Sequence, residues 1–302
     1  MVYGLVVAAL GVMRRLPLRF LYALAPVVGT LAWLLLWRQR RRAHENLALA
    51  FGDEKSPGER RRIGRGVFIH LARALGEALH AEELVRGRRC RVELAGLETL
   101  RELKEAGRSV VFVGAHFGPW ELLTPLAARE GFAILAVARE LADPRLDRFV
   151  RGLREAAGAQ VFYTRGTDTL KLVRALRNGA SLGILVDQNT RAAGIAVPFF
   201  GRPAHTPTGA MELAVATGSA VVPVFLRRQG YRRFAVEIQP PLDFPAGEAE
   251  ARIRWGVEEI TKRIEAVIRE HPEQWVWMHR RWKDRAGRRR YQRFKTSGEG
   301  GR

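Results

Sequence analysis

The sequence has very little cysteine and lacks several familiar catalytic signatures. Cys90 is the only cysteine among the 302 residues, which excludes an intramolecular disulfide and a cysteine-based zinc site or iron–sulfur cluster. The G-x-S-x-G, G-x-x-x-x-G-K-[ST], G-x-G-x-x-G and H-E-x-x-H motifs are also absent. We therefore expect no bound metal and no cofactor, and we find no evident nucleophile for a covalent acyl-enzyme.

Acidic residues are scarce relative to basic ones. The chain has 51 Lys and Arg against 31 Asp and Glu, a net charge of +20. Such an excess calls for a polyanionic partner, which would be nucleic acid, an anionic membrane face or an acidic protein. No helix-turn-helix spacing, zinc finger or RNP pattern is present. Tryptophans lie among the basic residues near the C-terminus, and this mixture fits a membrane interface at least as well as a base-stacking platform.

One long apolar segment lies near the N-terminus. Residues Phe20–Trp37 carry no charge, and as a helix they would be about 27 Å long, close to the ~30 Å hydrocarbon core of a bilayer. Arginines flank both ends, so the positive-inside rule does not orient the segment, and no small-residue cleavage site follows it. Spanning and interfacial arrangements both stay open, with a buried core helix as the third alternative. We expect residues 1–42 to anchor the protein to a membrane.

Residues 43–285 read as one α/β domain with a mostly parallel sheet flanked by helices. Short apolar runs alternate with helical periods near 119–130, 144–157, 168–178 and 207–217, which is typical of βαβ units. Residues 234–238 alternate like an edge strand, 248–270 predict a long amphipathic helix, and 40–80 predict helices with a break at 56–58. We expect the basic tail, 286–302, to be disordered. The apolar runs are Val110–Val113, Ile134–Val137, Val161–Tyr163, Leu182–Val186 and Ala220–Phe225.

The chemistry is expected directly after the first apolar strand. His116 follows that strand, at the sheet edge where α/β proteins bind ligands, and Glu121 comes five positions later. Gly118 and Pro119 allow a turn before a helix, so the two side chains can face each other. A carboxylate accepting from one imidazole nitrogen leaves the other as a general base. The alternative is that Glu121 only complements the helix dipole and His116 is an ordinary loop residue.

These residues resemble a known family. The H-x-x-x-x-E pattern in GAHFGPWE is similar to that of the glycerolipid-type acyltransferases, and within them to the lipid A secondary acyltransferases of the lauroyl and myristoyl type. The resemblance runs over nearly the whole chain. Its blocks, in order, are RRAHENLALAF, RELADPRLD, GLREAAG, RGTD, LGILVDQNT, VPFFGRPAHTPTG, GSAVVPVF and EQWVWMHRRWK.

The resemblance implies a membrane-bound enzyme on the cytoplasmic face of the bacterial inner membrane. It would move a fatty acyl chain from acyl carrier protein to a hydroxyl of a lipid A precursor, with His116 as base and Glu121 orienting it. Arg154 and Asp187 match functionally important positions, and Arg139 and Arg165 lie in matching blocks that suit a phosphorylated glycolipid acceptor.

Acidic carrier protein, anionic lipid and phosphorylated acceptor together explain the positive charge without nucleic acid. The alternatives are a different acceptor, such as a phosphatidylinositol mannoside or an amino-lipid, and a non-catalytic basic membrane protein that binds lipid.

Overall fold

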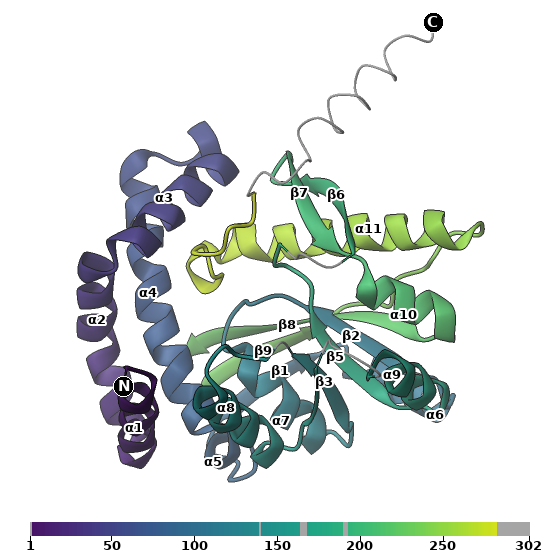
Figure 1. Cartoon of the computed structure of the whole chain (residues 1–302), viewed down its shortest axis with the longest axis horizontal. Coiled ribbons are helices and arrows are strands. Elements are labelled where there is room, and N and C mark those ends of the chain that lie inside the picture. Colours follow the sequence, from purple (N-terminus) through teal and green to yellow (C-terminus); the bar gives the residue numbers. More distant parts are fainter. Residues whose placement is uncertain (1, 139, 164–167, 190–192, 283–302) are drawn as a thin grey trace, which may run out of the picture.

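A seven-stranded sheet forms the centre of the molecule (Figure 1). The computed structural model describes residues 2–138, 140–163, 168–189 and 193–282. The strand order is β1-β9-β8-β2-β5-β3-β4, and β6 and β7 form a separate antiparallel hairpin. The strands are β1 Arg91–Ala95, β2 Val110–Gly114, β3 Ile134–Ala138, β4 Gln160–Tyr163, β5 Ser181–Leu185, β6 Gly194–Phe199, β7 Arg202–Pro207, β8 Ala220–Gly230 and β9 Arg233–Ile238.

The sheet is mostly parallel, which confirms the predicted fold class. Strand β2 runs parallel to β5 and β8, and β3 runs parallel to β4 and β5. All five predicted apolar strands are present. The prediction that 234–238 forms an edge strand is wrong, because β9 lies between β8 and β1 and is antiparallel to β8. Strand β1, which was not predicted, takes the edge, and its side chains alternate between exposed and half-buried.

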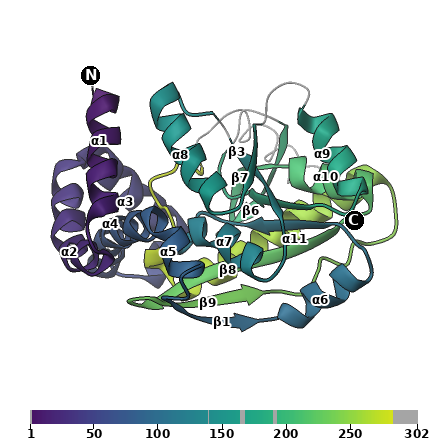
Figure 2. The same ribbon diagram turned by 90° about the horizontal axis from the view of Figure 1, so that it is seen from below.

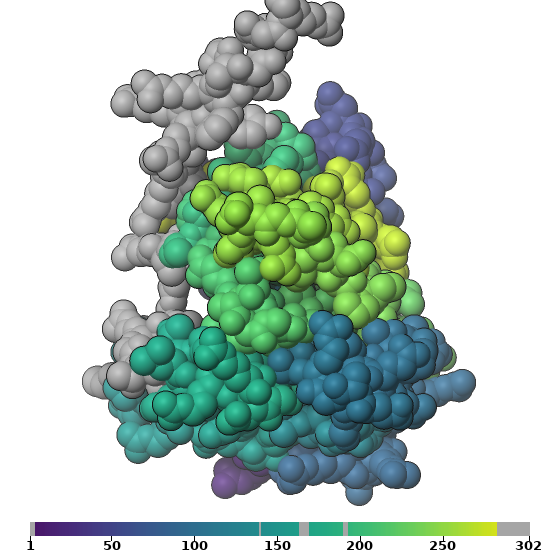
Figure 3. All heavy atoms as spheres, turned by 90° about the vertical axis from the view of Figure 1, so that its right-hand side faces the viewer, coloured from purple at the N-terminus to yellow at the C-terminus, as the bar shows by residue number. Residues whose placement is uncertain are grey.

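Helices cover both faces of the sheet. Alternate residues of β2 enter two separate hydrophobic clusters: Val111 and Val113 pack with α9, α10 and α11, whereas Val110 packs with α5, α6 and α7. Figure 3 shows α6, α9 and α11 closing the side of the molecule that lies away from the N-terminal helices. The helices are α5 Ala81–Val85, α6 Leu97–Glu105, α7 Leu123–Arg129, α8 Pro144–Ala156, α9 Asp168–Arg177, α10 Gly209–Thr217 and α11 Ala249–Glu270, with 3-10 turns η1 Gly52–Glu54, η2 Trp120–Leu122 and η3 Pro272–Gln274.

Four N-terminal helices form a layer at one side of the sheet (Figure 1). They are α1 Val2–Arg15, α2 Leu18–Leu35, α3 Trp37–Phe51 and α4 Pro57–Leu79. The predicted break at 56–58 is present: Ser56 caps α4, and its hydroxyl accepts from the Glu59 N–H while the Glu59 side chain accepts from the Ser56 N–H.

Helix α2 has one face against the protein and one face exposed. Within the described residues it is the one helix that is long and apolar enough to cross a membrane, and only 28% of its span is buried. A Cβ on Gly29 would lie 2.5 Å from the Cα of Ile69, so glycine allows α2 to approach α4 closely. The opposite face exposes apolar side chains, including Val28 and Leu31 at 52% and 50% exposed.

A buried polar network ties α2 to the sheet. The Tyr22 hydroxyl donates to Oε1 of Glu77 on α4 at 3.1 Å, and Glu77 forms an ion pair with Arg228 on β8. Arg228 also contacts the imidazole of His70 on α4. Burial, and then the charge of Arg228, hold the pKa of His70 well below its usual value, so His70 stays neutral. The membrane-facing helix is therefore joined to the sheet by a satisfied ion pair.

Candidate active site

His116 and Asp187 meet at the carboxyl ends of two neighbouring strands. In the parallel pair β2–β5, Gly114 lies opposite Leu185, so the residues two positions later come side by side. Nδ1 of His116 is 2.8 Å from Oδ1 of Asp187, and the His116 backbone N–H donates to Oδ2 at 2.9 Å. The strand register thus brings together two side chains that are 71 residues apart in the chain.

Asp187 is fully buried and accepts a further hydrogen bond. The indole N–H of Trp275 donates to Oδ2 at 2.8 Å, and the Asp187 side chain has no exposed area. Burial alone would raise the pKa of this carboxyl, but the nearby His116 charge and the hydrogen bonds from His116 and Trp275 hold it well below its usual range. Asp187 is therefore ionised, and it favours the tautomer of His116 that carries the proton on Nδ1.

The other nitrogen of His116 faces a glutamine. The side-chain amide nitrogen of Gln188 is 3.0 Å from Nε2 of His116 and 3.0 Å from Nε2 of His279. Burial, only partly offset by Asp187, lowers the pKa of His279 to about 4, so this imidazole is neutral near pH 7. One amide can thus donate to two neutral imidazoles, and Nε2 of His116 is an acceptor that can take a proton.

Glu121 forms an ion pair with Arg154 on α8. Nε and Nη2 of Arg154 donate to Oε2 and Oε1 of Glu121 at 3.0 and 2.7 Å, and the two side chains are 28% and 29% exposed. Burial would raise the pKa of the Glu121 carboxyl, but the Arg154 hydrogen bonds and charge outweigh it and lower the pKa. The carboxylate that accepts from the His116 ring is therefore Asp187, and Glu121 differs from its predicted orienting position by pairing with Arg154.

The turn between His116 and Glu121 depends on one glycine. Gly118 has φ +59°, and a Cβ there would lie 1.6 Å from the carbonyl oxygen of Leu226. Its N–H donates to the carbonyl of Gln274, which holds the loop against the C-terminal segment. Pro119 directly precedes the 3-10 turn η2, so the helical conformation starts one residue later than expected.

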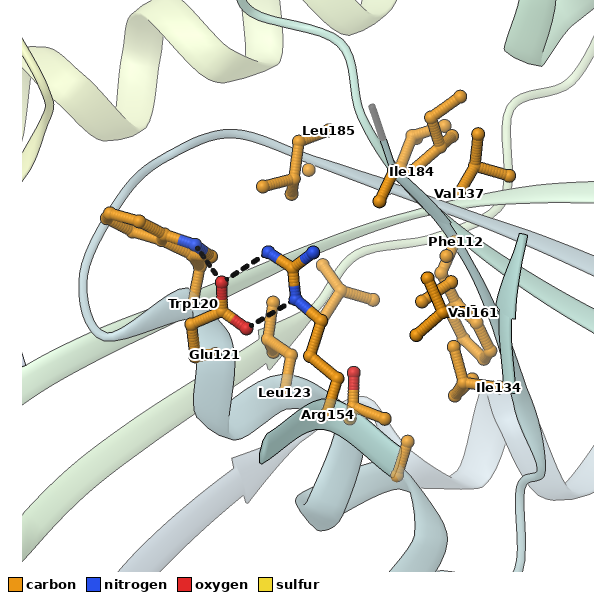
Figure 4. A pocket seen from close by; sticks show the side chains of 18 of the residues that line it. Phe112, Trp120, Glu121, Leu123, Ile134, Val137, Arg154, Val161, Ile184 and Leu185 are labelled. Atoms are coloured by element: carbon orange, nitrogen blue, oxygen red, sulfur yellow. Dashed lines mark hydrogen bonds and ion pairs between the residues drawn. The ribbon is translucent and has the colours of Figure 1, made fainter. Parts of the chain in front are cut away.

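A large apolar cavity adjoins this site. It has a volume of about 920 Å³, and its lining includes His116, Glu121 and Arg154. Most of the remaining lining is aliphatic or aromatic and comes from the sheet and from α6, α7, α9 and α10. Figure 4 shows the Glu121–Arg154 pair across the cavity from Val137, Val161 and Ile184. Such a cavity suits a long hydrocarbon chain whose reacting end lies at the polar side chains. We call it the central cavity.

Four predicted site residues, His116, Glu121, Arg154 and Asp187, gather at this edge of the sheet. Arg139, Arg165 and the tail 286–302 lie outside the described residues. Sequence reasoning did not single out Gln188, His279 or Trp275 as site residues, although each lies in a block that carried the family resemblance. Within the described ranges no three His, Cys, Asp or Glu side chains are grouped so that they could hold a metal ion.

Comparison with known proteins gives one consistent class. A family model described as bacterial lipid A biosynthesis acyltransferase matches residues 1–284. The chain is 29% identical to the lipid A biosynthesis lauroyltransferase of Escherichia coli (strain K12), over 92% of this chain and 90% of that enzyme. It is 28% identical to the lipid A biosynthesis palmitoleoyltransferase of the same strain, over 90% and 87%. It is also 27% identical to the phosphatidylinositol mannoside acyltransferase of Mycobacterium tuberculosis (strain ATCC 25618 / H37Rv), over 63% and 59%.

Proposed function

The chain belongs to the bacterial lipid A biosynthesis acyltransferase family, and we propose that it transfers a fatty acyl chain from acyl carrier protein to a hydroxyl of a lipid A precursor. We place the reaction at the cytoplasmic face of the bacterial inner membrane. The observation that carries the proposal is the His116–Asp187 pair beside an apolar cavity of about 920 Å³. A base next to a hydrocarbon-sized cavity is what transfer of a fatty acyl group to a hydroxyl requires.

In the proposed reaction His116 is the general base. Its Nε2 takes the proton of the acceptor hydroxyl as the oxygen attacks the thioester carbonyl carbon. The tetrahedral intermediate then collapses, the C–S bond breaks, and the departing sulfur receives the proton from the imidazolium. Asp187 keeps the Nδ1 proton in place and stabilises the imidazolium that forms. No enzyme nucleophile and no cofactor takes part in this scheme.

Glu121 and Arg154 act as a unit in the proposal. Glu121 holds the Arg154 guanidinium through two hydrogen bonds, so that the remaining N–H groups can meet an acceptor phosphate. The charge of Glu121 also favours a positive His116, because the two are close enough for His116 to lower the Glu121 pKa. Asp187 therefore carries the orienting role that the sequence suggested for Glu121. We propose Arg139 and Arg165 as further phosphate-binding residues on the family resemblance alone.

The net charge of +20 supports an acidic carrier protein as donor. A basic surface gains more from an extended acidic protein than from one small anion. With acyl carrier protein, kcat/KM should fall steeply as salt rises from low to physiological concentration, because screening slows association. Equal use of acyl-coenzyme A at matched concentration, or a salt-insensitive kcat/KM, would remove the carrier protein from the proposal.

The acceptor has one alternative with support of its own. The relatives include phosphatidylinositol mannoside acyltransferases, although they match a smaller share of this chain. Incubating the purified protein with acylated carrier protein and each acceptor, followed by mass spectrometry, tests the choice. We expect an added acyl group on the diphosphorylated, acylated glucosamine disaccharide. Product on the mannoside alone would replace the lipid A assignment.

A further inference from the structure

A second apolar pocket lies on the other side of the Glu121–Arg154 pair. Its volume is about 300 Å³, and α1, α4 and α8 contribute most of its lining. We call it the α1–α8 pocket. Among the described residues that line it, Glu121 and Arg154 are the only charged ones. The other lining residues are Leu10, Leu71, Ala74, Leu75, Ala78, Leu79, Ala81, Pro119, Trp120, Thr124, Phe149, Val150, Leu153 and Ala157.

The two hollows share a wall. Trp120, Glu121, Thr124, Val150 and Arg154 line both the central cavity and the α1–α8 pocket. The indole N–H of Trp120 donates to Glu121 at 3.2 Å, and the Trp120 ring lies 5.3 Å from the His116 ring. A molecule that occupies the α1–α8 pocket is therefore within one residue layer of the proposed base.

The pocket also continues toward the apolar surface of the N-terminal helices. Helices α1 and α8 lie side by side (Figure 2). Leu10 of α1 lines the pocket, and its neighbours Leu5, Val6 and Val12 are 70%, 40% and 56% exposed. Leu75 lines the pocket and is itself 41% exposed, so the pocket reaches the surface there. Exposed apolar side chains beside Arg14 and Arg15 at the end of α1 suit an anionic lipid surface.

We propose that the α1–α8 pocket binds one acyl chain of the lipid acceptor, while the central cavity holds the chain of the donor. The α1–α8 pocket lacks charge except at its inner end, which excludes a phosphorylated sugar from most of it and suits a hydrocarbon chain. Its opening lies among exposed apolar residues, so a lipid can enter from the membrane. The inner end carries Arg154, which can meet the polar part of the same lipid. This inference rests on the proposed acyl transfer to a lipid acceptor.

Filling the pocket tests the proposal. Ala78 lines the pocket from α4, and Ala78→Phe would place a ring in it. The matched control is Ala72→Phe on the same helix, six residues earlier, about 120° away around the axis and outside both linings. The probe is an acylated, diphosphorylated glucosamine disaccharide. We expect Ala78→Phe to raise KM for this acceptor by about tenfold or more, because each buried methylene contributes up to about fourfold in affinity.

The donor side should stay unchanged in the same variant. KM for the acyl donor and the preference for donor chain length should match those of wild type, and Ala72→Phe should match wild type throughout. An unchanged acceptor KM in a folded Ala78→Phe protein would overturn the proposal. A shifted donor chain-length preference would also overturn it, by assigning the α1–α8 pocket to the donor.

A binding measurement separates this inference from the reaction itself. A photoreactive diazirine near the end of an acyl chain of the same acceptor, presented in anionic vesicles, should label the pocket residues of α1, α4 or α8. Labelling there, with no acyl transfer by wild-type protein, would support the pocket and contradict the proposed function. Labelling only within the central cavity would contradict the pocket even if transfer occurs. Should Ala78→Phe not fold, the labelling result alone decides.

Discussion

Nδ1 of His116 and Oδ1 of Asp187 are 2.8 Å apart, and the backbone N–H of His116 binds the other oxygen of the same carboxylate. Because Asp187 also binds the Trp275 indole, its two oxygens hold the ring and the loop of His116 in one arrangement. Nε2 then faces the cavity side of the site, where Gln188 contacts it. The pair therefore presets the tautomer that a general base needs.

Asp187→Asn should lower turnover by about 10³-fold or more, since the neutral amide no longer favours the Nδ1 proton or the imidazolium. Trp275→Phe is the comparison, because it removes one hydrogen bond to Asp187 and keeps the charge. We expect a loss of about tenfold for that variant. Steady-state kinetics on both, with circular dichroism to verify folding, make the comparison. Equal losses in the two variants would show that Asp187 acts only as packing.

Removing Arg154 should destabilise the protein more than removing a neighbouring exposed arginine. In Arg154→Gln, Glu121 keeps a partly buried charge without its partner, and we expect a loss of about 1–2 kcal/mol in the free energy of unfolding. The control is Arg151→Gln on the same helix. Its partner Glu155 is 46% exposed, so the expected loss is below about 0.5 kcal/mol. Urea unfolding measures both, and equal losses would contradict a specific Glu121–Arg154 unit.

The fold could be predicted further than the site. The strands that became β2, β3, β4, β5 and β8 are apolar runs, because a parallel strand buried on both faces needs no polar alternation. Strand β1 was missed because its charged residues alternate with half-buried ones, and without β1 the neighbouring β9 looked like an edge.

In the site, His116 and Glu121 are close in sequence, so they suggested each other as partners. The observed partners, Asp187 and Arg154, depend on which strand lies beside β2 and on how α8 packs. Neither can be read from local spacing. The family resemblance, and not periodicity, had drawn attention to both residues.

Attachment to the membrane should depend on the exposed face of α2. Val28→Asp with Leu31→Asp places two charges on that face, and these residues do not pack into the core. We expect flotation with anionic vesicles to fall by about tenfold or more, because a carboxylate is costly to bury in lipid. Leu170→Asp on α9, at a residue 73% exposed, should leave flotation unchanged. Release of the wild-type protein by moderate salt alone would instead show a purely electrostatic attachment.

Acid should destabilise the protein partly through His279. Its pKa is about 4 in the folded protein against about 6.5 when unfolded, so the unfolded chain binds more protons between these values. Its contribution is therefore complete above about pH 7 and is lost as the pH falls toward 4. Between pH 7 and 5 the loss is about 2 kcal/mol.

Urea unfolding of His279→Gln at both pH values measures this share. The variant should lose about 2 kcal/mol less than wild type over that interval. The buried, neutral His70 still contributes in both proteins, so some acid sensitivity remains. An identical pH dependence in variant and wild type would contradict the role of His279.

Acyl transfer by His116→Ala is the most direct test of the central claim. The measurement is single-turnover transfer from acylated carrier protein to the acylated, diphosphorylated glucosamine disaccharide, followed by mass spectrometry, alongside the melting temperature of both proteins. We predict an unchanged melting temperature and a rate lower by about 10²–10⁴-fold, the usual contribution of a general base. A folded His116→Ala protein that transfers the acyl group at nearly the wild-type rate would contradict the mechanism.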